Sequence, residues 1–550
     1  MDEDSFPTGF DHIELAERGL ETVPIVLHRH AGEIITLNLS KNPLVDIPQD
    51  FVTDCLALRE LRLTHVAMKR IPRAVRQIKS LQWLDISCNR IMELEHAGLE
   101  QIPGLRQIFV QNNRLTNLPP SFIHMSSLKF LNISNNKFDE IPPVICGMPY
   151  LVDLDVSFNS ITVLPPGIGK LIGLERLIIV GNQIQTFPQE VQLMISLREL
   201  DCRRNLISDL SPLSNLPRLE SLLAEHNMVN ILDFVVGPRL FTLNASHNRT
   251  AKSTLRPLLP NLRFSLTTLD LSHLKLSTFD EDGAAFAAFT SLTSLKLDYN
   301  EFRSIPEVIC TLSELEVFSC TNNDLHDLPP NIGNLCKLRT FNVHNNNIKV
   351  VPQGIWECES LVELNMSSNS LEGWMDPLST QSSVGTASLG APADDTLDIE
   401  GIERKGSAAG LSFTSRSSPP LANSLQRLLL ADNYLGVQNR ATTFDIFRTL
   451  SYMRELRVLN LSFNQLNELP PLHLQGFAQL HELYLSGNNL TSLPGETIQK
   501  LLKLKVLHLN GNKLQTLPAE LGKVAGLETL DVGNNQLKYN VLNWQYDWNW

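Results

Sequence analysis

The chain has 550 residues, of which 43% are hydrophobic and 19% are charged, and its formal net charge is −13 at pH 7. This acidic balance argues against a general nucleic-acid-binding role. No stretch is long and apolar enough to span a membrane, and the acidic start Met1-Asp2-Glu3-Asp4 is not that of a signal peptide.

Asparagine recurs along the chain with a step of 23 residues. Two series keep this step: Asn113, Asn136, Asn159, Asn182 and Asn205, followed by Asn300, Asn323, Asn346 and Asn369. Around each lies one frame, L-x-x-L-x-L-x-x-N-x-L-x-x-L-P, which is typical of a leucine-rich repeat. We therefore predict an α/β solenoid: a leucine-rich repeat horseshoe with a concave parallel β-sheet and about 21 repeats.

The frame assigns a role to each of its residues. In L-x-L the two apolar side chains point into a shared core, and the residue between them points to the concave surface. The Asn amide is expected to satisfy backbone groups in the turn, each worth about 1–3 kcal/mol if left buried and unpaired. A Leu-Pro step such as Leu118-Pro119 then begins an irregular or polyproline-like convex side.

The predicted repeats run from one through Ile13 to one through Asn535. Three repeats replace the Asn, by Arg18, Val66 and Leu274. The step is 26 residues on either side of Leu274, where residues 283–289 are predicted to form a short convex helix. A later step of 31 residues contains a second predicted helix over 443–450.

The largest break in the period covers residues 375–424, which are rich in Ser, Thr, Gly, Ala and Pro. This composition predicts a disordered insertion between the repeats of 1–374 and those of 425–538. Residues 539–550 form an aromatic tail that leads out of the repeats.

Two short patterns within the insertion suggest regulation. Arg404 and Lys405 precede Ser407 in a pattern that resembles the one recognised by cAMP-dependent kinase, so Ser407 is a candidate phosphorylation site. Ser418-Pro419 is a proline-directed pattern. Such patterns are common by chance, and the alternative is a tolerated surface insertion with no regulatory role.

The eight cysteines are scattered along the chain, without the clustered pairs of an extracellular array or a C-x-x-C metal spacing. Reduced, cytosolic thiols are the expected state. Cys202 and Cys320 replace core leucines, whereas Cys88 follows its strand on the concave side. The repeats account for nearly every residue, so we expect no catalytic, cofactor-binding or metal site in this chain.

The concave side chains are those that the core does not need. Apolar and aromatic residues gather near the N-terminal end, followed by two arginines, and we predict a partner-binding surface from Trp83, Phe109, Phe130, Phe158, Ile178, Arg203 and Arg204, with Val180 in the same stripe. Acidic residues are interleaved with them: Asp85, Asp153, Asp155, Asp201, Asp270 and Asp298. The alternative is that any long concave sheet shows some aromatic residues.

Histidines occupy equivalent positions of three successive repeats, at His226, His247 and His273. Neighbouring parallel strands lie about 4.8 Å apart, so this spacing is compatible with a metal site. No accompanying set of carboxylates or cysteines is evident, which favours a solvated ladder of side chains.

Several stretches resemble the repeat region of fungal adenylate cyclases. They are the start from Asp11 to Leu20 and on to His30, Ala67-Met-Lys-Arg-Ile-Pro72, Leu84-Asp-Ile-Ser-Cys-Asn-Arg-Ile91, Gly104-Leu105 with Val110-Gln-Asn-Asn-Arg-Leu115, and the end from Leu530 to Tyr539 with Tyr546-Asp-Trp-Asn-Trp550. The resemblance extends over essentially the whole chain, and its two ends are more specific than generic repeats.

The resemblance implies a function for the repeats. In that family a Ras-association segment precedes them, and a phosphatase-2C-like domain and a class III cyclase domain follow. It implies a regulatory region that receives GTP-bound Ras and couples it to cAMP synthesis, cytoplasmic and, through Ras, peripheral at the plasma membrane. Mg²⁺ or Mn²⁺ is implied only for the cyclase domain of full-length relatives, which has no counterpart here.

A second hypothesis stays open. The chain could instead be a freestanding cytosolic leucine-rich repeat scaffold that brings a Ras-type GTPase or a protein phosphatase to its substrate. An in-frame phosphatase-like and cyclase region beyond Trp550 in the transcript would favour the cyclase hypothesis.

Overall fold

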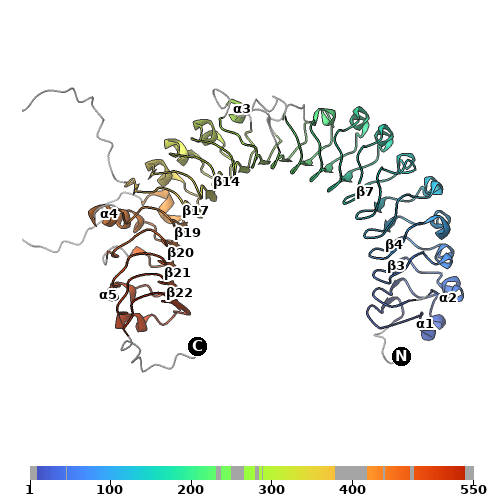
Figure 1. Ribbon diagram of the computed structural model, residues 1–550, viewed down its shortest axis with the longest axis horizontal. Helices are drawn as coiled ribbons and strands as arrows, with labels where there is room; N and C mark the ends of the chain where they lie inside the picture. The colour runs from blue at the N-terminus through green and yellow to red at the C-terminus, as the bar shows by residue number, and fades with distance from the viewer. Residues whose placement is uncertain are drawn as a thin grey trace, which may run out of the picture. The chain divides into compact units, whose positions relative to one another are not determined.

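The computed structural model describes residues 9–44, 46–230, 237–248, 265–278, 284–287, 289–377, 418–437, 440–470 and 476–538. The chain divides into two compact units, one of residues 1–325 and 340–346 and one of residues 326–339 and 347–550. Within each unit the strands line one side and short helices the other (Figure 1). No helix in the described ranges is long and apolar enough to cross a membrane.

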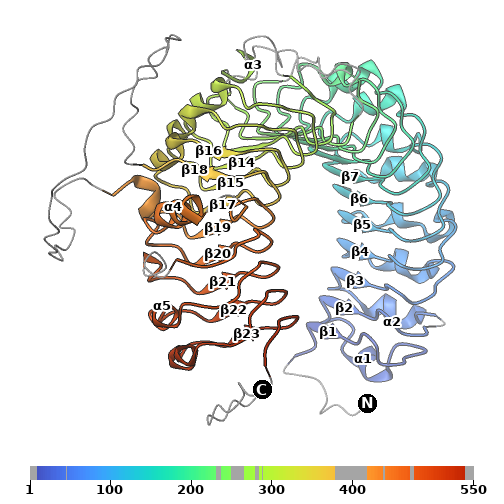
Figure 2. The same cartoon turned by 60° about the vertical axis from the view of Figure 1, so that its left-hand side comes forward.

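The described residues of the first unit form fifteen short parallel strands, which follow one another along it (Figure 2). They are β1 (His12–Glu14), β2 (Thr36–Asn38), β3 (Glu60–Arg62), β4 (Trp83–Asp85), β5 (Gln107–Phe109), β6 (Phe130–Asn132), β7 (Asp153–Asp155), β8 (Arg176–Ile178), β9 (Glu199–Asp201), β10 (Ser221–Leu223), β11 (Thr242–Asn244), β12 (Thr268–Asp270), β13 (Ser294–Lys296), β14 (Val317–Ser319) and β15 (Thr340–Asn342).

Short helices form the opposite side of this unit. They are α1 (Ile25–Arg29), α2 (Gln49–Asp54), η2 (Arg73–Gln77), η3 (Glu95–Ala97), η4 (Leu99–Gln101), η5 (Pro120–His124), η6 (Ile145–Gly147), η7 (Pro166–Lys170), η8 (Gln189–Leu193), η9 (Ser211–Leu213), α3 (Ala284–Ala287) and η11 (Glu307–Thr311), most of them single 3₁₀ turns. The predicted convex helix over 283–289 is confirmed by α3.

The second unit has the same architecture. Its strands are β16 (Val350–Val351), β17 (Glu363–Asn365), β18 (Gly373–Trp374), β19 (Arg427–Leu429), β20 (Val458–Asn460), β21 (Glu482–Tyr484), β22 (Val506–His508) and β23 (Thr529–Asp531). Its helices are η12 (Pro330–Asn334), η13 (Gln353–Glu357), η14 (Pro420–Asn423), α4 (Arg440–Leu450), α5 (Gly495–Ile498) and η16 (Ala519–Lys523). Strands β16 and β18 form a separate two-stranded sheet, and α4 confirms the helix predicted over 443–450.

The described residues of the two units together contain 21 strands of parallel repeat sheet, so the predicted solenoid of about 21 repeats is confirmed. The first Leu of L-x-L is the middle residue of the three-residue strand, and it is buried: Leu84 and Leu177 are at most 1% exposed. The residue after it, the x of L-x-L, is partly exposed in both strands, as predicted. Since each core leucine packs between adjacent repeats, the core extends along each unit.

The repeat asparagine ties each turn to the preceding one. The Asn182 side-chain amide donates to the carbonyls of Val156, Ile179 and Val180, at 3.0 to 3.4 Å. Its Oδ1 accepts from the backbone N–H of Ile161, at 3.1 Å. The predicted role of the amide is therefore confirmed.

The residue before each repeat Asn, or before Leu274 where the Asn is replaced, adopts a left-handed backbone, with φ from 49° in Asn135 to 71° in Gly511. We call these residues the turn row. Its members in β7 to β13 repeats are Phe158, Gly181, Arg204, His226, His247, His273 and Tyr299. Among residues with a side chain, Asn, Asp and His adopt this conformation most readily, which explains much of the row's composition.

Repeat structure extends into the predicted insertion from both sides. The carbonyl of Met375 accepts from the indole N–H of Trp356, and Leu421 of η14 is fully buried. Pro419-Pro420 begins η14 just as Pro119-Pro120 begins η5, a signal present in the sequence. Residues 378–417, Ser407 among them, lie outside the described ranges.

Candidate partner-binding surface

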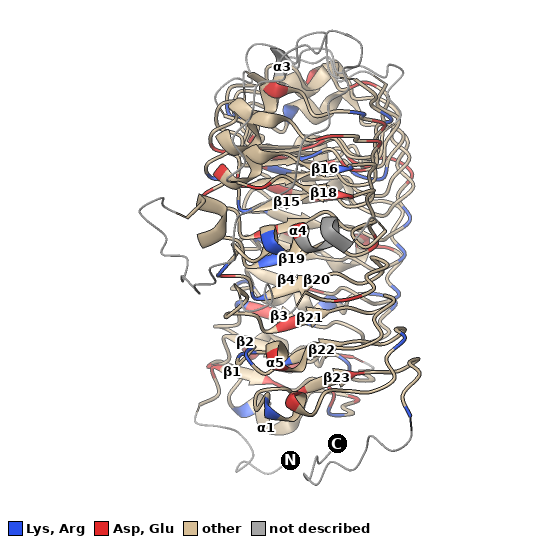
Figure 3. Cartoon of the chain, turned by 90° about the vertical axis from the view of Figure 1, so that its left-hand side faces the viewer, with Lys and Arg blue, Asp and Glu red and all other residues tan. Residues whose placement is uncertain are grey.

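Most strands of the first unit leave two side chains partly or fully exposed, one on either side of the buried middle residue; in β9 the second of them, Asp201, is buried. From β4 to β9 one row of paired residues comprises Trp83, Gln107, Phe130, Asp153, Arg176 and Glu199, and the other Asp85, Phe109, Asn132, Asp155, Ile178 and Asp201. We call them the first row and the second row. Lys, Arg, Asp and Glu are interspersed along the repeats (Figure 3).

Three side chains on β3, β4 and β5 form a contiguous cluster. Trp83 and Phe109 lie against each other with ring centroids 5.2 Å apart and a tilt of 44°. The guanidinium of Arg62 lies 4.8 Å from the centroid of the Trp83 ring. We call Arg62, Trp83 and Phe109 the aromatic cluster; all three remain partly or fully exposed. A cation–π contact and a tilted ring pair hold these solvent-accessible side chains together.

The other predicted apolar residues lie in different rows. Phe130 is in the first row, Ile178 in the second row and Phe158 in the turn row. The ring of Phe158 covers Gly181, where a Cβ atom would lie 2.7 Å from Cδ1 of Phe158. Phe158 is 52% exposed, whereas Val180 is only 9% exposed and belongs to the edge of the core.

Most polar residues of the second row have a structural role. Asp85, Asn132 and Asp155 each accept a hydrogen bond from the backbone N–H two residues later, at 2.9 Å. This Asx turn stabilises the exit from the strand. Phe109 and Ile178 occupy the same row but cannot supply the acceptor. Their side chains are therefore not explained by the turn, which makes them better candidates for contact with a partner.

The two predicted arginines differ in their surroundings. Arg203 donates to both carboxylate oxygens of Asp201, at 2.8 and 2.7 Å, and lies 3.8 Å from Glu225. Hydrogen bonding to Asp201 raises the pKa of Arg203, and burial raises the pKa of Glu225. Arg204 is exposed in the turn row. Arg203 is thus already engaged by its own chain, whereas Arg204 faces solvent.

The three histidines form a stack that ends on a tyrosine. Ring centroids are 4.1 Å apart for His226 and His247, 3.8 Å for His247 and His273, and 4.1 Å for His273 and Tyr299. Burial lowers the pKa of each histidine, so the neutral form is favoured. Across the described ranges, no three His, Cys, Asp or Glu side chains are placed to hold a metal ion.

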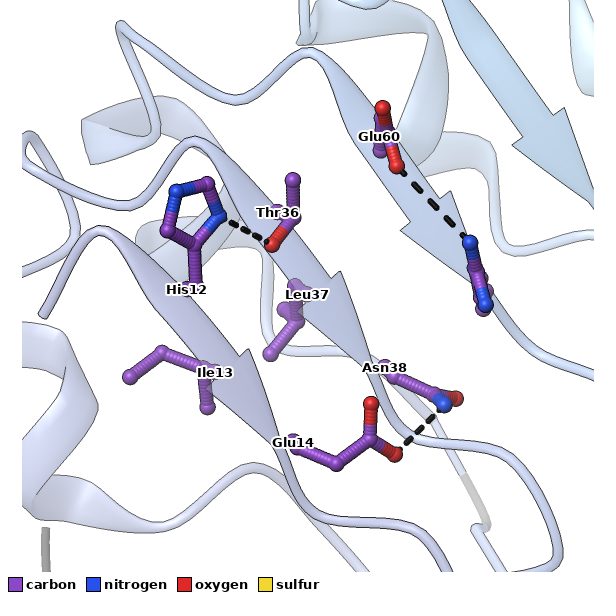
Figure 4. A pocket seen from close by; sticks show the side chains of 8 residues that line it. His12, Ile13, Glu14, Thr36, Leu37, Asn38 and Glu60 are labelled. Atoms are coloured by element: carbon purple, nitrogen blue, oxygen red, sulfur yellow. Dashed lines mark hydrogen bonds and ion pairs between the residues drawn. The ribbon is translucent and has the colours of Figure 1, made fainter. Parts of the chain in front are cut away.

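A small pocket of about 150 Å³ lies over β1 to β3 (Figure 4). Its polar side chains pair with one another: His12 Nδ1 lies 2.9 Å from the Thr36 hydroxyl, and Asn38 donates to Glu14 at 2.6 Å. Arg62 lines this pocket and also contacts Trp83. The aromatic cluster therefore borders a polar depression.

Three residues of this surface were not predicted from the sequence: Arg62, Glu225 and Tyr299. The repeat spacing does contain a signal for two of them, because Arg62 precedes the second-row residue Asp85 by 23 positions and Tyr299 directly precedes Asn300. All eight cysteines, which lie within the described ranges, carry free thiols, with Cys202 and Cys320 fully buried as predicted. Phosphorylation of Ser407 stays a prediction.

Comparison with known proteins agrees with this architecture. The family described as "Leucine rich repeat" matches residues 34–91, 103–161 and 478–537, and "Leucine Rich repeats (2 copies)" matches residues 454–501. A leucine-rich repeat protein of Leptospira interrogans of known structure is similar, with a TM-score of 0.60 and 26% identity over 65% of this chain and 89% of its own. The chain folds as a leucine-rich repeat solenoid.

Fungal adenylate cyclases are among the proteins that this chain resembles over most of its length. The adenylate cyclase of Mycosarcoma maydis is 46% identical over 98% of this chain and 22% of its own length. That of Schizosaccharomyces pombe is 30% identical over 85% of this chain and 26% of its own. The chain thus matches the repeat region of fungal adenylate cyclases, as the resemblance implied, and spans about a quarter of the length of these relatives.

Proposed function

We propose that this leucine-rich repeat chain is the regulatory region of an adenylate cyclase, and that it receives a GTP-bound Ras-type GTPase and couples it to cAMP synthesis. Similarity to adenylate cyclases over 98% of the chain supports the choice of enzyme. The single observation that carries the site is the aromatic cluster of Arg62, Trp83 and Phe109. In this proposal the chain reaches the plasma membrane from the cytoplasm through its GTPase partner.

The composition of the surface suits a protein partner. Trp and Arg are the commonest anchors of interfaces, and they contribute most where a rim of polar residues excludes water. Polar side chains are available on the same strands and on strands farther along, because Glu60 of β3 lies 3.9 Å from Arg62, and Arg176 of β8 lies 2.8 Å from Asp153 of β7. Phe109 also stands where neighbouring repeats place an Asx-turn acceptor, so the fold does not require its ring.

The dimensions are compatible with a small GTPase. A domain of about 170 residues has an expected radius of gyration near 16 Å and is roughly 40 Å across. Strands spaced at about 4.8 Å would allow it to cover about eight repeats. The stretch from β3 to β9 lies within that number and includes the aromatic cluster, Phe130, Phe158 and Arg204.

Substitution at the aromatic cluster tests the site. We expect Phe109→Ala to weaken binding of the GTP-loaded GTPase by about 1–3 kcal/mol in calorimetry, because an anchor ring is lost. Its melting temperature should stay close to that of the parent, since Phe109 is not a core residue. Phe130→Ala, in the first row, tests a second anchor in the same way.

Two controls separate binding from folding. Ile123→Ala removes an apolar side chain that is 50% exposed on η5, on the opposite side of the repeats, and should leave affinity unchanged. Leu177→Ala should cost about 2–5 kcal/mol of stability by opening a core cavity. The proposed site is wrong if Phe109→Ala and Phe130→Ala both bind as tightly as the parent.

A further inference from the structure

The apolar core is incompletely covered at the last repeat. Leu507, Leu509 and Leu514 of the β22 repeat are fully buried, but their equivalents one step later, Leu530, Val532 and Leu537, are only half-buried. At the other end of the repeats Ile13 and Leu15 are each 4% exposed, and the ring of Phe10 stacks on His30 at 3.7 Å. Described residues therefore cover the first repeat but not the last.

The outer edge of β23 is open as well. In the preceding repeat the carbonyl of Lys505 accepts from two N–H groups of the next strand, at 2.8 and 2.9 Å, and the N–H of Leu509 donates to Asp531. The matching groups on β23 are the carbonyl of Glu528 and the N–H of Val532, and neither has a partner in the described part of the chain. An open edge beside an exposed apolar surface promotes association unless something covers it.

Residues 539–550 do not follow the repeat frame. Asn540 and Val541 stand where the preceding repeat has Leu517 and Pro518. The Leu-Pro step that begins the convex side of other repeats is therefore absent from these residues.

The same residues alternate strictly between aromatic and polar. Trp544, Tyr546, Trp548 and Trp550 are separated by Gln545, Asp547 and Asn549. In an extended segment this alternation puts every aromatic ring on one face and every polar side chain on the other. Each such ring can bury roughly 150–250 Å². That is ample to cover three half-buried aliphatic side chains.

We propose that residues 539–550 cap the last repeat, with the aromatic face of 544–550 packed on Leu530, Val532 and Leu537. The segment follows the described residues directly, so its local concentration at this end is high. It shields the open core and leaves its polar face to water. A second copy of the chain, packed end to end on the same surface, is the competing occupant.

Hydrogen exchange of the full chain, measured by mass spectrometry, tests the cap. In a variant with Trp544→Ser, Trp548→Ser and Trp550→Ser, the backbone hydrogens of residues 525–538 should exchange at least about tenfold faster than in the parent. In the parent, local opening of these residues must also break their contacts with the cap, which makes opening rarer. Exchange over residues 150–180 should not change, which shows that the variant is folded. The matched control is Gln545→Ser, Asp547→Ser and Asn549→Ser, which should exchange like the parent.

Three outcomes would overturn the cap. The aromatic variant could exchange like the parent, or the polar-face variant could lose as much protection as the aromatic one. Protection of 525–538 in the parent could also disappear on dilution together with a halving of the mass by light scattering, which would assign the surface to a second copy.

Discussion

At the residue scale, the turn after most strands requires an asparagine because it uses both hydrogen-bond donors and an acceptor from one short side chain. Asn182 donates to three carbonyls of two neighbouring turns and accepts from the N–H of Ile161. An aspartate lacks the donors, and an alanine lacks both. At Val66, where the Asn is replaced, the backbone N–H donates to Oδ1 of Asn89 in the next repeat, at 3.0 Å.

We expect Asn182→Ala to lower the free energy of unfolding by at least about 2 kcal/mol, because each buried group left unpaired costs about 1–3 kcal/mol. Denaturant unfolding followed by circular dichroism measures it. Gln183→Ala, at the exposed neighbouring position, should change stability by less than about 0.5 kcal/mol. Equal stability of the two variants would contradict the role assigned to the Asn amide.

The stacked histidines make stability depend on pH. Burial lowers the pKa of His226, His247 and His273 in the folded chain, so the unfolded chain binds more protons as pH falls. Their destabilising effect is absent well above the ordinary histidine pKa and develops as pH drops below about 6.5. Asp270 and Asp298 oppose it at His273, but burial is the larger effect.

Replacing the middle of this stack with a residue that suits the left-handed backbone isolates the effect. Between pH 7.5 and pH 5.5, the melting temperature of His247→Asn should fall less than that of the parent, because the variant lacks one histidine whose pKa is lowered by folding. Asn tolerates the positive φ at this position, so the backbone is not strained. Thermal melts at the two pH values measure it. A parent whose melting temperature does not fall more than that of His247→Asn would show that the stack has no such role.

At the element scale, the sequence predicted the repeat elements well and the surface pattern poorly. The strands, the Leu-Pro steps and two convex helices follow from spacing and backbone chemistry, which act within one repeat. Whether two concave side chains touch depends on the rows that they occupy and on their rotamers, and both involve more than one repeat. Trp83 and Phe109 meet although they lie in different rows, while Arg203 is held by Asp201. Element η14, with its Pro-Pro start, lies within residues 375–424, where composition alone predicts an insertion, because a single 3₁₀ turn leaves little trace in composition.

Helix α4 anchors the long repeat between β19 and β20. Ile446, Phe447 and Leu450 are at most 3% exposed, at helical spacing on one face. Phe447→Ala should cost about 3–5 kcal/mol of stability by leaving a cavity. Arg448→Ala is the control, because its ion pair with Asp376 at 3.2 Å is half-exposed and contributes little. Equal free energies of unfolding for the two variants in denaturant would refute this role for α4.

At the scale of the whole molecule, the chain is a stack of units whose stability comes from contacts with immediate neighbours. Such an array offers a long surface that changes little when one exposed residue changes, which is why binding and folding can be tested separately. The account assigns that surface in the first unit to a GTPase whose nucleotide controls the interaction. A GTPase that binds equally in both nucleotide states could not carry a signal, because a ligand without differential affinity shifts no equilibrium.

Calorimetric titration of this chain with a Ras-type GTPase, loaded in turn with a non-hydrolysable GTP analogue and with GDP, tests the central claim most directly. The account predicts measurable binding of the GTP form, at least about tenfold tighter than that of the GDP form, and weakening of the GTP form by Phe109→Ala. Equal affinity for the two forms, or no binding of the GTP form, would contradict it.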